Sequence, residues 1–301
     1  MKVLKASIAL LLILMLAACA SQQSAQKDNV KQPIEKEEVT VDQEEAVAPE
    51  AEPVIRYVVD TVMHGDTRKT EDDITLFSYA VEVPELTAWR EDGTQITEAA
   101  TPEEEKALQA VQVFHDRFTV WYAEETLAEL EQNAQSDFDF RKESDIDWYM
   151  GYQIELNCSV YQTEKLVSIS AAYYAYTGGA HPNTYLLGWT FDLENGTFYG
   201  PEGMAGQTQL QEAVSAEIIR QATERAAKEG MNPEEFFWPE YESIIAEWPN
   251  YAVSFDENGM NVAFSPYELA AYAAGPQIFH MPYEWLVPYL DEHGLEVLEL
   301  N

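Results

Sequence analysis

Apolar and polar residues alternate most clearly between residues 152 and 161, where every second side chain is apolar. A period of two predicts a β-strand with one face in a core. Leu166–Tyr176 continues the pattern after a polar turn, so the two segments are expected to form a hairpin. The pattern places Cys158 on the apolar face, where a thiol behaves as a small hydrophobe. We therefore interpret Cys158 as a structural residue.

Other segments predict further strands and helices. Thr101 is a predicted N-cap, with Pro102 at the first helical position and Glu104 completing a capping box, and this helix is expected to run to about Gln132. Apolar residues recur every four positions over 210–228, which predicts a second long helix. The further strands are expected near residues 54–63, 77–83, 184–193, 197–199, 251–255, 262–264 and 277–281, with a short helix over 282–290.

Strands and helices are mixed without strict alternation, which favours an α+β fold with a largely antiparallel sheet packed with helices. We expect two consecutive α+β units, residues 54–134 and residues 148–301, separated by a polar connection over 135–147.

The first 53 residues predict export and tethering. Lys2 and Lys5 precede an apolar run that is too short to span a membrane, and Leu-Ala-Ala comes directly before Cys19. Residues 1–19 are therefore similar to a bacterial lipoprotein signal peptide with its lipobox, which implies a diacylglycerol thioether on Cys19. Residues 20–53 are acidic and lack aromatic residues, so we expect a disordered tether. The implied location is the cell envelope: the outer membrane in a Gram-negative bacterium, otherwise the outer face of the plasma membrane.

The composition is strongly acidic. The net charge is −37, from 17 basic and 54 acidic residues. Such a charge argues against a nucleic-acid partner and favours a cationic partner, or serves solubility alone. With Cys19 lipidated, Cys158 has no partner for an intrachain disulfide, so a packed core is expected to supply the stability.

One loop combines unusual residues. Gly178 and Gly179 permit positive φ angles, and Pro182 restricts the backbone of His181, which lies before it. The loop connects two predicted strands and could hold one imidazole in a defined direction. Alternatively, it is a tight connection in which His181 only bonds a backbone carbonyl.

Two stretches carry a resemblance to known proteins: Tyr176 to Asn183, with the sequence YTGGAHPN, and Pro266 to Pro276. Their order resembles an exported bacterial family of unknown function. It is similar to the extracellular domain of the lysozyme-binding anti-sigma factor and to the non-catalytic N-terminal region of peptidoglycan deacetylases. The resemblance implies an α+β domain outside the cytoplasmic membrane and raises lysozyme binding as a hypothesis. The sigma-binding segment, a spanning helix and the deacetylase catalytic domain are not expected here.

The residues favour binding over catalysis. None of the five histidines has metal-binding helical spacing, and the sequence has no nucleophile elbow, phosphate loop or dinucleotide fingerprint, so we expect neither metal nor cofactor. We expect a membrane-anchored, non-catalytic binding domain, with a basic protein such as a lysozyme-like muramidase as its partner. The alternative is a hydrolase of peptidoglycan or a related polymer that uses His181. The residues expected to bind are Tyr176, Gly178, Gly179, His181, Asn183, Pro266 and Tyr267.

Overall fold

The computed structural model describes residues 54–146, 148–205 and 207–300. The predicted signal peptide, Cys19 and the predicted tether lie outside the described residues. All the described residues belong to one compact unit. No helix within the described part of the chain is long and apolar enough to cross a membrane.

Six strands follow one another in sequence order across the larger sheet: β1 (Ile55–Lys69), β2 (Thr75–Arg90), β3 (Tyr152–Gln162), β4 (Leu166–Tyr176), β5 (Asn183–Asp192) and β6 (Thr197–Tyr199). Every neighbouring pair is antiparallel except β2 and β3, which run parallel. A parallel pair needs a long crossover, and helices supply it here. The predicted α+β class with a largely antiparallel sheet is confirmed.

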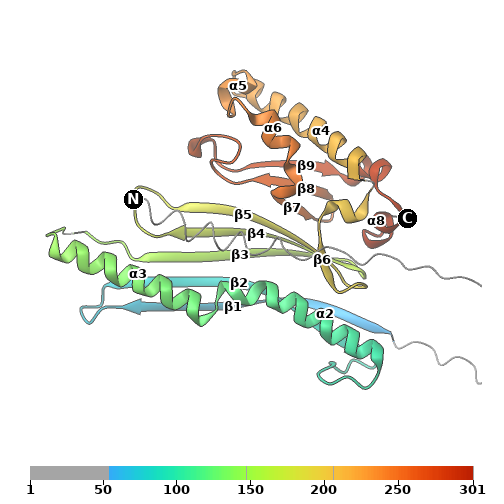
Figure 1. The fold of residues 1–301 in the computed structure, drawn as a ribbon, viewed down its shortest axis with the longest axis horizontal. Coiled ribbons are helices and arrows are strands. Elements are labelled where there is room, and N and C mark those ends of the chain that lie inside the picture. Colours follow the sequence, from blue (N-terminus) through green and yellow to red (C-terminus); the bar gives the residue numbers. More distant parts are fainter. Residues whose placement is uncertain (1–53, 147, 206, 301) are drawn as a thin grey trace, which may run out of the picture. The chain divides into compact units, whose positions relative to one another are not determined.

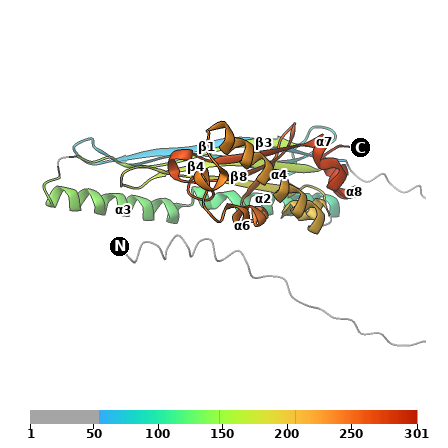
Figure 2. The same ribbon diagram turned by 90° about the horizontal axis from the view of Figure 1, so that it is seen from above.

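Two helices make the crossover from β2 to β3. They are α2 (Pro102–Phe118) and α3 (Glu124–Glu143), separated by the short 3-10 helix η1 (Thr119–Trp121), and they follow one another along the strands (Figures 1 and 2). The apolar faces of the helices and the sheet share one core, to which Phe114, Phe118, Leu156 and Ile169 contribute fully buried side chains. Cys158 packs against this core, as its place in the alternating pattern predicted.

The predicted start of α2 is confirmed, but its predicted length is wrong. The Thr101 hydroxyl accepts the N–H of Glu104, and the Glu104 carboxylate accepts the N–H of Ala100. The chain leaves the helix at Phe118 and begins a second helix at Glu124. The predicted polar connection over 135–147 is also wrong, since α3 continues to Glu143. Acidic residues in the first turn of α3 and basic residues in its last turn complement the helix dipole.

The second sheet is formed by the last three strands, β7 (Ala252–Phe255), β8 (Gly259–Phe264) and β9 (Gln277–Pro282). It shares a core with α4 (Gln207–Lys228) and α6 (Tyr241–Ala246), built around Val214, Ile218, Ile245 and Phe264. The remaining elements are short: η2 (Pro201–Met204), α5 (Pro233–Phe236), η3 (Trp248–Asn250), η4 (Tyr272–Ala274), α7 (Tyr283–Leu286), η5 (Val287–Tyr289) and α8 (Glu292–Val297).

The two sheets meet where β7 crosses β4 and β5. Ser168 and Gly188 lie on the faces of β4 and β5 that point away from α2 and α3, because their neighbours Ile169 and Leu187 pack in the helix-covered core. The Ser168 hydroxyl accepts the N–H of Phe255 at 2.7 Å. A Cβ atom on Gly188 would lie only 2.2 Å from the carbonyl oxygen of Val253. Glycine therefore permits the close approach of β7.

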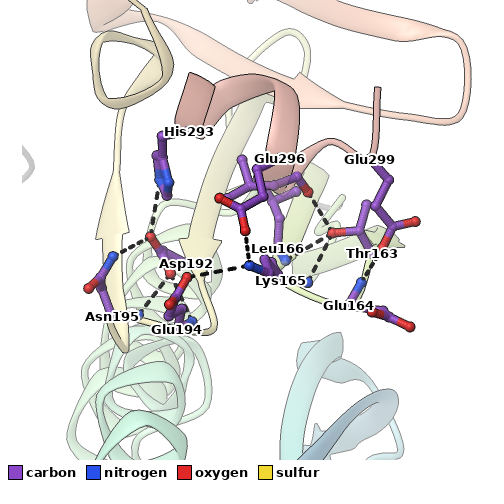
Figure 3. A network of polar contacts seen from close by, with 11 residues as sticks. Thr163, Glu164, Lys165, Leu166, Asp192, Glu194, Asn195, His293, Glu296 and Glu299 are labelled. Carbon is purple, nitrogen blue, oxygen red and sulfur yellow. Dashed lines mark hydrogen bonds and ion pairs between the residues drawn. The ribbon is translucent and has the colours of Figure 1, made fainter. Parts of the chain in front are cut away.

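Polar contacts tie α8 to the turns of the larger sheet (Figure 3). The buried Thr163 hydroxyl, in the turn between β3 and β4, donates to the carbonyl of Val297 at 2.7 Å. Asp192, at the end of β5, accepts from the backbone and side chain of Asn195 and lies 3.4 Å from the His293 imidazole. The end of the described chain is thus joined to two turns far away in the sequence.

Strands on both sides of the predicted boundary at residues 135–147 belong to one sheet, because β2 pairs with β3. The division into units 54–134 and 148–301 stays a prediction about how the domains are organised.

Candidate functional site

The loop between β4 and β5 has the backbone that its glycines predict. Gly178 and Gly179 have φ angles of +88° and +101°, which side-chain-bearing residues rarely adopt. Tyr176, at the end of β4, is 6% exposed, and its hydroxyl donates to the carbonyl of Gly179 at 3.2 Å. Tyr176 therefore fixes the loop from inside, while Gly179, His181 and Asn183 are exposed.

The second signature stretch lies beside this loop. It begins where β8 ends, and the buried Ser265 hydroxyl accepts the N–H of Leu186 on β5 at 3.0 Å. Tyr267 follows with a φ of +74°, an unusual conformation for an aromatic residue. Its N–H donates to the carbonyl of Ala270, and its carbonyl accepts the Trp238 indole N–H at 3.0 Å. The backbone of Tyr267 is thus held at both ends.

Side chains from the two stretches meet at His181. The Tyr267 ring is 52% exposed, and its hydroxyl lies 3.3 Å from Nε2 of His181. The Tyr272 ring stacks on the imidazole with a centroid distance of 4.1 Å and an angle of 22°. We name His181, Tyr267 and Tyr272 the aromatic triad. Pro266, which directly precedes Tyr267, is half-buried. Of the two residues of the second stretch that were expected to bind, Tyr267 is the more exposed.

Hydrogen bonds assign the proton on the His181 ring. Nδ1 lies 2.8 Å from the carbonyl of Pro182, an acceptor only, so Nδ1 carries the proton and donates it. In the neutral imidazole, Nε2 then accepts the Tyr267 hydroxyl. Both ring nitrogens are engaged, and the histidine makes the carbonyl contact expected of a residue that fixes a turn. The arrangement presents a rigid aromatic surface.

Cys158 is unsuited to nucleophilic chemistry. Burial, with a smaller effect of the Glu82 carboxylate, raises the pKa of its thiol to about 12. The sulfur donates to the carbonyl of Glu82 at 3.1 Å. Among the residues that the structure describes, no group of three or more His, Cys, Asp or Glu side chains could hold a metal ion.

Sequence reasoning missed two contacts of the triad: the Trp238 indole bond to Tyr267 and the stacking of Tyr272 on His181. Trp238 lies far from both stretches in the sequence, and only its indole bond to Tyr267 reveals its role. Tyr272 belongs to the second stretch, but its stacking on His181 has no signal in the spacing of residues.

Comparisons with known families divide the chain in two. Residues 70–184 match the family model described as "Deacetylase PdaC", and residues 201–284 match the model described as "Protein of unknown function (DUF3298)". His181 lies in the first match, and Tyr267 and Tyr272 lie in the second. The triad therefore joins the two matched regions.

A solved structure resembles the chain in fold, and a second one matches with a lower score. A crystal structure of a DUF3298 family member from Bacteroides fragilis has a TM-score of 0.57 and 14% identity, covering 81% of this chain and 98% of that chain. A DUF3298 family protein from Pseudomonas aeruginosa has a TM-score of 0.45 and 15% identity, covering 78% of this chain and 95% of that chain. No curated protein matches. The two family models, together with the fold shared with the Bacteroides fragilis structure, support an uncharacterised DUF3298-type domain in this chain.

Proposed function

We propose that the protein is an envelope lipoprotein whose folded unit binds a protein ligand through the aromatic triad. The observation that carries the proposal is the meeting of His181, Tyr267 and Tyr272 on an exposed surface. Aromatic side chains on a rigid support are typical anchors of protein interfaces, because little side-chain entropy is lost on binding. The strained φ of Tyr267 and its indole contact supply the support.

The proposed ligand is a basic protein, with a lysozyme-like muramidase as the candidate. The net charge of −37 attracts a cationic partner and speeds its encounter. The resemblance of the two signature stretches to the lysozyme-binding anti-sigma factor motivates this choice.

Substitution of the triad tests the proposal. We expect immobilised lysozyme to retain the full-length wild-type protein and to lose Tyr267→Ala, because this exposed ring would be a contact. Ile278→Ala serves as the control, since Ile278 is an exposed apolar residue on β9. Equal retention of Tyr267→Ala and the wild type would contradict the role of the triad.

A second candidate function is hydrolysis of peptidoglycan or a related envelope polymer with His181 as the base; the first matching family model is described as a deacetylase, and deacetylation is itself a hydrolysis. In that case the Tyr267 hydroxyl would have to leave Nε2 before the imidazole could accept a proton. Incubation of purified cell wall with the protein tests whether it hydrolyses this polymer. Product formation that is lost in His181→Ala would support catalysis.

Anchoring at Cys19 is the third part of the proposal. It is supported by the residues before Cys19 and not by any described contact. Growth of expressing cells with labelled palmitate should label the wild type and leave Cys19→Ser unlabelled. Membrane fractionation of a bacterial host then distinguishes the outer membrane from the plasma membrane.

A further inference from the structure

Three large apolar side chains are exposed near the end of α3 and the start of β3. Phe140 is 63% exposed, Trp148 57% and Met150 59%. These values are among the highest for large apolar side chains in the described part of the chain. Grouped exposed apolar residues mark interaction sites more often than single ones do. We name Phe140, Trp148 and Met150 the apolar patch.

Tyr149 and Gly151 hold the backbone beside Trp148 and Met150 in place. Tyr149 points inward between Trp148 and Met150, with its hydroxyl 3.0 Å from the carbonyl of Ala134 and 3.2 Å from that of Leu76. One residue further, a Cβ on Gly151 would lie 2.6 Å from the carbonyl oxygen of Thr75. Because Tyr149 is anchored, the side chains on either side of it point away from the core.

Trp148 is also held through its ring. The Arg141 guanidinium carbon lies 4.4 Å from the ring centroid, a cation–π contact. Arg141 in turn pairs with Asp137 one turn earlier on α3, with Nε 3.0 Å from the carboxylate. The indole is therefore ordered before any partner arrives, which lowers the entropy cost of binding.

The patch continues towards the aromatic triad. A Cβ on Gly178 would lie 3.9 Å from the Asp137 carboxylate and 4.0 Å from the Tyr152 ring. The loop that presents His181 thus borders the same Asp137 that orients Arg141 over Trp148. Gly178, Asp137 and Arg141 therefore place the triad loop near Trp148 of the apolar patch.

Exposed acidic side chains outnumber exposed basic ones at the end of α3, beside the apolar patch, where Lys142 is also exposed. Asp139, Glu143 and Asp145 are exposed on the last turns of α3 and just after them. Tryptophan, methionine and phenylalanine are enriched in interface centres, whereas a charged rim sets the choice of partner. An apolar centre with mainly acidic neighbours fits a basic protein with an apolar contact area of its own.

We propose that Phe140, Trp148 and Met150 form a second contact area for the basic protein that the aromatic triad binds. This inference rests on the proposed function. The two areas would act as one interface, with the Gly178–Gly179 loop between them.

The test is a calorimetric titration of lysozyme into the full-length protein in detergent at low salt. We expect Trp148→Ala to raise Kd at least 10-fold, as for a typical hot-spot residue, and Met150→Ala to raise it less. The matched control is Met231→Ala, because Met231 is exposed in the turn between α4 and α5; its Kd should equal that of the wild type. All substituted side chains are exposed, and melting temperatures will verify folding.

The outcomes separate the two claims. If the wild type does not bind lysozyme, both the proposed function and this inference are wrong. If the wild type binds and Trp148→Ala binds equally well, only the apolar patch is excluded. Hydrogen exchange on the wild type provides an independent measurement, because amides 138–151 should gain protection in the complex. Unchanged exchange there would also overturn the inference.

Discussion

Tyr267 shows how a single residue directs the candidate surface. Its positive φ is costly for an aromatic residue and persists only where the surroundings hold it. The bond from Trp238 to its carbonyl and the bond from its N–H to Ala270 supply that restraint. The strain therefore aims an exposed ring at His181 and motivates the binding hypothesis.

Cys158 gives a prediction for one thiol. In a Cys19→Ser background Cys158 is the only cysteine in the chain. Because burial raises its pKa from the ordinary 9 to about 12, its thiolate fraction at pH 8 should fall roughly 10³-fold. Alkylation by iodoacetamide should be correspondingly slow in the folded protein and rapid in denaturant. Equal rates in both states would contradict the buried position of the thiol.

Glu104 gives a prediction for acid stability. The Arg90 guanidinium, followed by the Ala100 N–H, lowers the pKa of Glu104 to about 2 from an ordinary 4.5. A carboxylate with a lowered pKa stabilises the fold above about pH 4.5, and this contribution disappears as the pH falls towards about 2. Urea unfolding should show Glu104→Gln to be less stable than the wild type near neutral pH. The difference should shrink with acidification, and a constant difference would contradict the assignment.

Local sequence patterns predicted some parts of the fold correctly. The strand Leu166–Tyr176 has the predicted bounds, and Thr101 caps its helix as predicted. Alternation also placed Cys158 correctly, because one face of β3 packs in a core. Contacts between distant residues, such as Trp238 with Tyr267, have no local signal, so sequence reasoning could not find them.

At the scale of elements, the main error was the loop predicted over 135–147, where α3 continues to Glu143. The last two turns of this helix contain many acidic residues, which indicated a loop, and its apolar side chains do not form one clear stripe. The helix continues because pairs four residues apart, such as Asp137 with Arg141 and Gln135 with Asp139, support its exposed side. The error concealed the apolar patch, whose residues lie at this helix end and just beyond it.

The crossing of β7 over β5 gives a prediction for an element contact. Gly188→Ala would place a methyl group against the backbone of Val253 and push the two sheets apart. We expect the free energy of unfolding to fall by about 1–3 kcal/mol in urea denaturation. Ser170, the exposed residue directly opposite on β4, provides the control. Ser170→Ala should change stability by less than about 0.5 kcal/mol, and an equal loss in both variants would exclude the proposed clash.

At the scale of the whole molecule, charge and surface act together. The chain has 54 acidic and 17 basic residues, so its net charge attracts a basic partner. The aromatic triad and the apolar patch would then supply the specific contacts. The net charge predicts only that a partner is basic. The contact between His181 and Tyr267 required the fold, since these residues lie 86 positions apart in the sequence.

Calorimetric titration of the wild-type protein with lysozyme at two ionic strengths tests the central claim most directly. We predict measurable binding at low salt and at least 10-fold weaker binding at an ionic strength of about 0.15 M, where the screening length falls to about 8 Å. An absence of binding heat at low salt, verified by an independent method such as analytical ultracentrifugation, would contradict the proposed function.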